Sequence, residues 1–366
     1  MKNINDLFFE LIQVSIGTRI CLSHTPSASE WGKLYSMAKK QSLVGVCFAG
    51  VKKLVEQQQE PPEMLYLTWM GMAAKIQQRN EVVNKQCVEL QEKLAADGFH
   101  SYIMKGQGNS FLYGEFAMLR QSGDIDVYLE GGLDKVLAYA NMFAPTNEVN
   151  ELEMHVKVYD DTEVEFHYRP FIMRNPIKNA RLQSFFKDAM RFDNKIALPN
   201  DVGLINVPTT EFNLVHQMVH IYHHLMTEGV GMRQLMDYNF LLCSVPSFDS
   251  TQEPSSKVRD VIRDLGLDRF ASALMWVLGY VFGLKREQML WNPCEEDGKM
   301  LLEDIVRSGN FGNYDEKMAS LGNKWISFWY VSSKTLRFWR FDHWAWFWSP
   351  LWRIYHFCWR KMKGFN

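Results

Sequence analysis

Residues 102–130 read YIMKGQGNSFLYGEFAMLRQSGDIDVYLE, and this stretch decides the fold. Its pattern predicts a strand, a glycine-broken turn into a short helix, a loop, and a second strand that carries Asp124 and Asp126. Side chains two residues apart on a strand point to the same face, so we expect these two carboxylates to lie side by side. Like charges held that close need a compensating cation, and Mg²⁺, or Mn²⁺ in its place, suits oxygen ligands. The stretch therefore predicts a metal site.

A phosphate-binding turn is predicted just upstream of the two carboxylates. Lys105 and Gly106 stand where the first strand ends and the short helix begins, and Gly108 continues the turn. Backbone amide groups at the start of a helix, together with a lysine, suit a phosphate group. Nucleotide transfer from a triphosphate requires a metal site beside a phosphate site. We therefore interpret 102–130 as part of a metal-dependent nucleotidyl-transfer site.

A third carboxylate comes from a later pair of strands. Residues 154–159 and 162–167 alternate between apolar and polar side chains on either side of a short polar pair, which predicts a hairpin. On the second arm, Glu165 and His167 share one face and the apolar residues take the other. Glu165 is the best candidate for a third metal ligand or for a base, and His167 is placed to touch the same site.

Composition limits the class of protein. The chain has 366 residues, of which 47% are hydrophobic and 22% charged, and its net charge is −2. These values indicate a folded protein without the global basic field of a dedicated nucleic-acid binder. The six cysteines form no Cys-x-x-Cys pair, the N-terminus lacks a signal-peptide pattern, and no apolar run is long enough to span a bilayer. We expect free thiols and a cytoplasmic location.

The periodicity along the chain predicts an α+β protein with four regions. Helical spacing dominates both ends of the chain, and the mixed pattern is confined to its centre. The expected regions are a helical N-terminal region over 1–99, a catalytic core over 100–175, a helical domain over 176–323, and a Trp-rich basic tail over 324–366.

The central residues resemble a known family. The stretch is similar to nucleotidyltransferases of the DNA polymerase β superfamily, and most similar to a bacterial branch of nucleotidyltransferases with an uncharacterised role. The matching residues are Lys105-Gly106, Leu112-Tyr113, Arg120, Gly123-Asp124-Ile125-Asp126-Val127 and Val164-Glu165-Phe166-His167, with His216, His220, Arg233 and Asp237 further on. The resemblance implies a small mixed sheet flanked by helices, with Asp124, Asp126 and Glu165 as metal ligands.

The phosphate-binding turn departs from the superfamily pattern. The wider superfamily has a Gly-Ser pair there, whose hydroxyl contacts the triphosphate, whereas this chain has Lys105-Gly106-Gln107-Gly108. A lysine replaces the hydroxyl as a point charge rather than as an oriented donor. Arg120 has two interpretations: it neutralises the leaving pyrophosphate, or it is a solvated loop arginine.

Four histidines, at positions 216, 220, 223 and 224, share most of one helical face. Three interpretations stay open: a packed cluster, a wall of the nucleotide or acceptor pocket, and a zinc site. The resemblance favours the second, with His216 and His220 facing the cleft. It also implies that Arg233 and Asp237 support the nucleotide site as a pair, for which the alternative is an ordinary i, i+4 ion pair.

The tail over 324–363 combines tryptophan with positive charge. It holds eight of the chain's 12 tryptophans and eight cations against the single acid Asp342. This composition is typical of an interfacial helix on an anionic membrane, here the inner membrane face, and equally of an aromatic face that packs on the protein or on a partner. Single-stranded nucleic acid is the least favoured partner. Pro350 is expected to separate two helices.

The sequence therefore predicts an enzyme, a Mg²⁺-dependent nucleotidyltransferase. It would transfer a nucleoside monophosphate from a nucleoside triphosphate to a hydroxyl acceptor, which is a small molecule, a sugar or a protein. Two alternatives are a transferase that uses a nucleotide sugar or another phosphate-linked donor in polysaccharide or peptide tailoring, and a non-catalytic nucleotide-binding regulatory or antitoxin-like module. The three carboxylates disfavour the last.

Overall fold

A four-stranded mixed sheet lies at the centre of the computed structural model, which describes residues 3–144, 148–245, 255–308 and 332–365. The strands are β1 (Ser101–Met104), β2 (Ile125–Leu129), β3 (Glu153–Val156) and β4 (Val164–His167), and their order in the sheet is β1-β2-β4-β3. β2 runs parallel to β4, and the other two pairs are antiparallel. A parallel pair needs a crossover, which α6 (Gly132–Ala140) and β3 provide. The α+β prediction with a small mixed sheet is confirmed.

Strand register brings the polar side chains of three strands together. Asp126 pairs with Glu165 across β2 and β4, and His167 pairs with Glu153 across β4 and β3. The predicted hairpin of β3 and β4 is therefore present. β2 begins at Ile125, so Asp124 lies just before the strand and not on it as the sequence predicted.

The two faces of the sheet have different neighbours. One face packs apolar side chains such as Val127 and Phe166 against α4 (Glu63–Ala96) and α6. The other face carries Asp126, Glu165 and His167 toward α8 (Thr210–Met226), and Tyr102 of this face contacts Phe212 of α8 edge-on. The polar face of the sheet is thus covered by a helix and not by bulk water.

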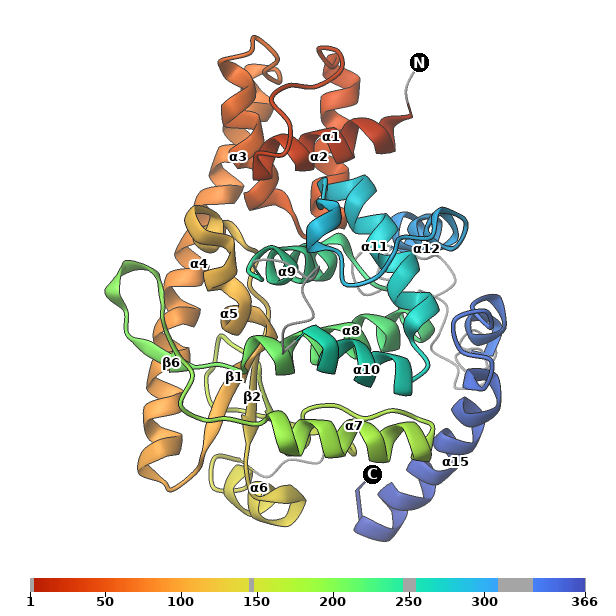
Figure 1. Ribbon diagram of the computed structural model, residues 1–366. Helices are drawn as coiled ribbons and strands as arrows, with labels where there is room; N and C mark the ends of the chain where they lie inside the picture. The colour runs from red at the N-terminus through yellow and green to blue at the C-terminus, as the bar shows by residue number, and fades with distance from the viewer. Residues whose placement is uncertain (1–2, 145–147, 246–254, 309–331, 366) are drawn as a thin grey trace.

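Helices surround the sheet and form most of the protein. Figure 1 shows α4 running down one side of the molecule, from the N-terminal helices to the far end of the sheet. The N-terminal helices are α1 (Ile4–Ile16), α2 (Ala28–Lys40), α3 (Val44–Val55) and α4, and the later ones are α7 (Pro176–Ala189), α8, α9 (Met232–Cys243), α10 (Ser255–Asp264), α11 (Asp268–Phe282) and α12 (Glu295–Ser308). One apolar core joins the N-terminal helices to α8, α9 and α11.

Between α7 and α8 the chain forms a small hairpin where the sequence predicted helix. Its strands, β5 (Lys195–Ala197) and β6 (Leu204–Asn206), are antiparallel. Pro199 and Gly203 lie in the connecting turn, and these residues disfavour a helix. Gln91 of α4 ties the hairpin down, since its side chain accepts a 2.7 Å hydrogen bond from the amide of Asn206.

The C-terminal helix α15 (Ala345–Lys363) lies on the side of the molecule opposite α4 (Figure 1). Pro350 stands inside α15 and does not separate two helices, because a proline in the second turn removes a single backbone hydrogen bond. Residues 324–331 of the predicted tail lie outside the described residues. No helix in the described part of the chain is long and apolar enough to cross a membrane.

Candidate active site

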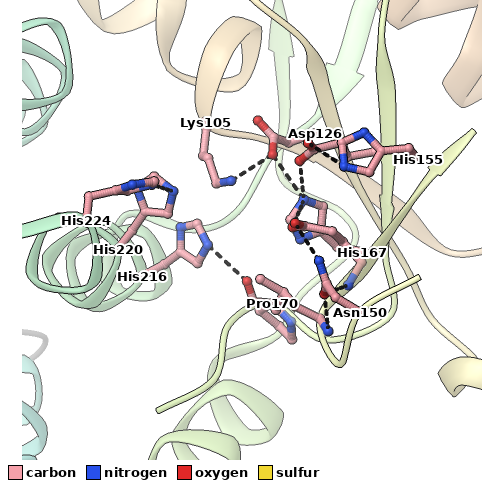
Figure 2. Close-up of polar contacts among 12 residues, drawn as sticks. Lys105, Asp126, Asn150, His155, His167, Pro170, His216, His220 and His224 are labelled. Carbon is pink, nitrogen blue, oxygen red and sulfur yellow. Dashed lines mark hydrogen bonds and ion pairs between the residues drawn. The ribbon is translucent and has the colours of Figure 1, made fainter. Parts of the chain in front are cut away.

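The site is built around Asp126, which is 3% exposed. Lys105 Nζ donates a hydrogen bond of 2.7 Å to Asp126 Oδ1, and His167 Nε2 lies 3.0 Å from the same oxygen. His167 Nε2 also lies 3.2 Å from Glu153 Oε2 and 3.5 Å from Glu165 Oε2. Figure 2 shows Lys105 and His167 both directed at Asp126. Three carboxylates and two cationic side chains therefore form one cluster, which we call the acid cluster.

The acid cluster is held by mutual charge compensation. Burial alone would lower the pKa of Lys105 and of His167, but the charges of the carboxylates outweigh burial and raise both. Burial would raise the pKa of Asp126, yet Lys105 and His167 hold it well below its usual range. Burial dominates at Glu165 and raises its pKa. Asp126 is therefore a permanent carboxylate, whereas Glu165 can accept a proton near neutral pH.

The donor set of the cluster fits a divalent metal ion. Ligand atoms of Asp126, Glu165 and His167 lie within 4.8 Å of one another, and so do those of Glu153, His155 and Glu165. Carboxylate oxygens suit Mg²⁺ and Mn²⁺, and an imidazole nitrogen favours a transition metal such as Mn²⁺. Asp126 and Glu165 come together as predicted, and their assignment as metal ligands stays a prediction.

Glu153 was missed by the sequence analysis because β3 begins one residue earlier than expected, and His155, although inside the predicted strand, was not proposed as a site residue. Asn150 fixes the start of this strand: its Oδ1 accepts hydrogen bonds of 2.7 and 2.9 Å from the amides of Leu152 and Glu153. The alternation of Glu153 and His155 with apolar residues was the available signal. Between them and Asn150, Glu151 is buried, and its carboxylate oxygens find no hydrogen-bond partner among the described residues.

Asp124 lies at the margin of the acid cluster. It lines the same cavity as Asp126, but its carboxylate is absent from both groups of potential ligands within the described residues. The negative charge of Asp126, followed by burial, raises the pKa of Asp124. The two carboxylates therefore interact electrostatically, although they do not lie side by side on one strand.

The lysine-glycine turn adopts an unusual backbone. Lys105 has φ = 45° and Gly106 has φ = 26° and ψ = −114°, so the turn breaks the start of α5 (Lys105–Ser110). Gly106 lines the cavity, whereas Gly108 does not. A Cβ atom at Gly108 would lie 2.3 Å from the carbonyl oxygen of Ile103, so glycine there allows the helix to pack closely on β1. Gly108 is thus explained by packing, and the Lys105 side chain points to Asp126.

Arg120 is buried and paired, which excludes the solvated-loop interpretation. Its Nε and Nη2 atoms each donate a 2.7 Å hydrogen bond to Asp237 of α9, and Tyr113 donates to the same carboxylate. Asp237 therefore pairs directly with Arg120, and its charge also acts on Arg233, where it opposes the lowering of the pKa by burial. Arg233 instead donates a 2.9 Å hydrogen bond to the carbonyl oxygen of Gln121. Both arginines line the cavity beside Asp124.

The histidines of α8 form a row on the other side of Lys105, in which the rings of His216 and His220 stack and that of His224 meets His220 edge-on (Figure 2). Burial, followed by the charge of Lys105, lowers the pKa of His216 to about 3 and that of His220 well below its usual value. His216 Nε2 donates to the carbonyl oxygen of Pro170 at 3.1 Å, and His220 Nε2 lies 3.1 Å from His224 Nε2. His220 lines the cavity and His216 does not. No group of three potential metal ligands in the described residues includes these histidines, so nothing favours a zinc site.

A cavity of about 650 Å³ connects these parts. Its walls come from the acid cluster, the turn at Lys105, the loop before β2, and helices α8 and α9. A further wall was not predicted: Trp352, Arg353 and His356 of α15 close the cavity, together with Arg174 from the loop before α7. We call this unit the cleft. The aromatic tail thus packs on the protein and contributes to the cleft.

Comparison with known families places the chain as a whole. The model of the family described as uncharacterised nucleotidyltransferase matches residues 27–283, more than half of the chain, so this chain belongs to that family. The match covers the sheet, α8 and α9, and it ends before α12 and α15. Among curated proteins and solved structures, none matches the chain.

Proposed function

We propose that this protein transfers a nucleoside monophosphate from a nucleoside triphosphate to a hydroxyl group of an acceptor. The single observation that carries the proposal is the convergence of Asp126 and Glu165 with Lys105 on one cleft. Membership of a nucleotidyltransferase family supports nucleotidyl transfer in general. The hydroxyl acceptor and the Mg²⁺ requirement are our extension.

In the proposed reaction an acceptor oxygen forms a bond to the α-phosphorus. The bond between that phosphorus and the β-phosphate oxygen breaks, pyrophosphate leaves with the electron pair, and the acceptor proton passes to a base. Asp126, Glu165 and Asp124 would hold Mg²⁺ or Mn²⁺, which when bound supplies positive charge to the phosphate oxygens. Glu165 suits the role of base, because burial raises its pKa toward neutrality.

The remaining side chains position the triphosphate. Lys105 and Gly106 lie next to Asp126, where the lysine can exchange its carboxylate partner for a phosphate oxygen. Arg233 lines the cleft at Gly123 and Asp124 and is the better candidate for the leaving pyrophosphate. Arg120 would act through Asp237, as a positioning residue. His167 orients the carboxylates, and His220 forms part of the nucleotide or acceptor wall, with His216 packed behind it.

Two alternative functions remain: an enzyme that uses a different donor, and a protein that binds a nucleotide without catalysing a reaction. A nucleotide-sugar donor would use the same acid cluster, and nothing in the cleft distinguishes it from a triphosphate. A non-catalytic nucleotide-binding module would not need three carboxylates on adjacent strands, so the acid cluster favours an enzyme.

The test is label transfer from each α-labelled triphosphate with Mg²⁺ or Mn²⁺, in the presence of cell extract as the source of acceptor. Asp126→Asn should reduce transfer by about 10²–10³-fold, because it removes a charge that acts at the reacting phosphate. Asp160→Asn is the matched control, because Asp160 is an exposed acid whose ion pair is with Lys157 in the same loop. Glu165→Gln, at the rim of the acid cluster, serves as a second site variant if Asp126→Asn does not fold. Undiminished transfer by both site variants would refute the assignment.

The location of the protein is proposed to be cytoplasmic, with peripheral contact at the inner membrane face. Support comes from the outward side of α15, where Trp346, Ile354, Tyr355, Phe357 and Met362 are all at least 51% exposed. Aromatic side chains beside Lys361 are typical of an interfacial helix. Two cations of the tail pair within the protein and not with a membrane, since Arg337 and Arg340 make ion pairs with acids of α12.

A further inference from the structure

Three buried amide side chains form a hydrogen-bonded row where α5 meets α8. Gln217 Nε2 donates a hydrogen bond of 3.1 Å to Asn213 Oδ1, and Asn213 Nδ2 donates one of 2.8 Å to Asn109 Oδ1. Gln217, Asn213 and Asn109 are 5%, 4% and 1% exposed. Both polar atoms of the central amide are thus used within the row. We call these three residues the amide relay.

The two ends of the amide relay have opposite hydrogen-bonding character. An amide group carries one NH₂ donor and one carbonyl acceptor. Asn109 Nδ2 and Gln217 Oε1 have no hydrogen-bond partner among the described residues, so a donor is left at one end and an acceptor at the other. If all three amide groups turned over together, the donor and the acceptor would exchange places. One end therefore donates and the other accepts in either direction.

Both ends of the amide relay reach the cleft. Asn109 and Gln217 line it, whereas the central amide does not. The two end atoms are not among the fully buried polar atoms without a partner, so a ligand in the cleft can reach them. A second group of amides differs, since Gln107 donates to Asn80 and Asn84 and none of these three lines the cleft. That second group serves the fold, whereas the amide relay is open to a ligand.

The combination of one donor with one acceptor selects the chemistry of the ligand. A phosphate or carboxylate group would meet a repulsive acceptor at one end, and an ammonium group would meet a repulsive donor at the other. A neutral group that both donates and accepts satisfies both ends. A hydroxyl does so whichever way the relay runs, because its proton rotates to suit its neighbours, whereas a nucleobase edge has a fixed order of donors and acceptors. The amide relay therefore fits hydroxyl groups best.

The amide relay lies close to the proposed phosphate-binding turn. Asn109 belongs to α5, which begins at Lys105, and Gln217 precedes His220 on α8 by about one helical turn. Burial, followed by the charge of Lys105, lowers the pKa of His220, so the start of α5 and this part of α8 are near each other. In a nucleoside triphosphate, the ribose is the first neutral group after the phosphates. The ribose is consequently the part of a bound nucleotide that the amide relay would meet.

We propose that Asn109 and Gln217 bind the 2′ and 3′ hydroxyl groups of the nucleotide's ribose, and that Asn213 is a positioning residue that sets the polarity of both ends. This inference rests on the proposed function for the presence of a nucleotide, and it deepens that function by assigning ribonucleotides as the donor class. The amides are already ordered by their own hydrogen bonds, so little freedom is lost when the ribose binds.

The test measures nucleotide binding to the full-length protein by calorimetry, with Mg²⁺ and non-hydrolysable α,β-methylene triphosphates. For the base whose analogue binds most tightly, the ribose form is compared with its 2′,3′-dideoxy form. We expect the wild-type protein to bind the dideoxy form roughly tenfold more weakly, because the amides are then left unpaired. In Gln217→Leu the ribose form should lose affinity, and the difference should shrink to less than about twofold, because a hydroxyl without its partner contributes no preference.

Two further variants separate the relay from a general loss of structure. Asn213→Leu breaks the relay without touching the ligand, so it should also reduce the difference between the two forms, and it tests the relay if Gln217→Leu fails to fold. Gln86→Leu is the matched control, because Gln86 is a buried glutamine that is 8% exposed and donates to Asp161 away from the cleft. It should keep the wild-type difference. A loss of structure would weaken both forms equally and leave their ratio unchanged.

Equal binding of the ribose and dideoxy forms by the wild-type protein would overturn this inference, as would a difference that persists in both relay variants. A change of preference among bases, and not for the ribose, would overturn it too. In each case label transfer by the wild-type protein would leave the proposed function standing. If the relay variants abolish the difference but the wild-type protein transfers no label, the proposed function fails and the ribose site stands. A wild-type protein that binds no nucleotide would contradict both.

Discussion

The loop before β2 and the loop before α7 each carry an arginine into the cleft, yet among the described residues only the first of them makes an ion pair with a carboxylate. Arg120 makes two hydrogen bonds to Asp237 and is 4% exposed. Arg174 has a hydroxyl and a tryptophan ring as neighbours. A buried cation that makes two hydrogen bonds to a carboxylate is held firmly by the fold, whereas Arg174 feels the charge of Glu228 only at longer range.

The largest expected effect concerns stability. Arg120→Ala leaves Asp237 buried without its cation, so we expect the free energy of unfolding to fall by about 3–5 kcal/mol. Arg174→Ala removes a cation that makes no ion pair among the described residues, so its cost should be smaller than that of Arg120→Ala. Urea denaturation followed by circular dichroism measures both. Equal losses in the two variants would contradict the distinction between the loops.

An intermediate effect concerns metal binding at the acid cluster. Lys105 competes with a metal ion for the charge of Asp126, so Lys105→Met should strengthen Mn²⁺ binding to the free protein by about tenfold, or about 1.4 kcal/mol. The same variant should weaken triphosphate binding, because we propose that the lysine also binds the phosphates. Lys157→Met, at an exposed lysine of the loop between β3 and β4, is the control in the same calorimetric titration. Weaker Mn²⁺ binding in Lys105→Met would show that the lysine supports the metal site instead.

The smallest expected effect concerns the outward side of α15. The double variant Ile354→Glu with Phe357→Glu should reduce sedimentation with anionic liposomes by a few fold, because both side chains are exposed and apolar. Met142→Glu, at an exposed apolar residue next to α6, is the control. Unchanged sedimentation would contradict membrane contact through α15 and would favour contact with a protein partner instead. Point variants are preferable to removal of the tail, since α15 also closes the cleft.

The sequence predicted the parts of the site that depend on local pattern. Alternation placed Glu165 and His167 on one face, and the spacing of the Gly-Asp-Ile-Asp segment placed Asp126 on a neighbouring strand. The α+β fold and the family were confirmed for the same reason. The four domain boundaries stay predictions, although one apolar core already joins the N-terminal helices to later ones.

The remaining parts depend on contacts between residues far apart in the chain. Arg120 and Asp237 are 117 residues apart, and Arg174 and Ser349 are 175 apart. No periodicity connects such positions, so the pairing of Arg120 and the packing of α15 on the cleft could not be predicted. The hydrogen bonds from Arg120 to Asp237 were not predicted either, because the sequence analysis considered only the spacing of Arg233 and Asp237 along one helix.

Helix α4 has a mechanical consequence for the whole molecule. Its 34 residues make a rod about 50 Å long. Near the middle of the rod, Asn80 donates hydrogen bonds to the carbonyl oxygens of Met118 and Arg120, and further along Gln91 holds β6. Because these contacts all come from one helix, the positions of the Arg120 loop and of the β5–β6 hairpin both depend on how α4 is placed by the N-terminal helices. A single helix thus connects the packing of the N-terminal helices to one wall of the cleft.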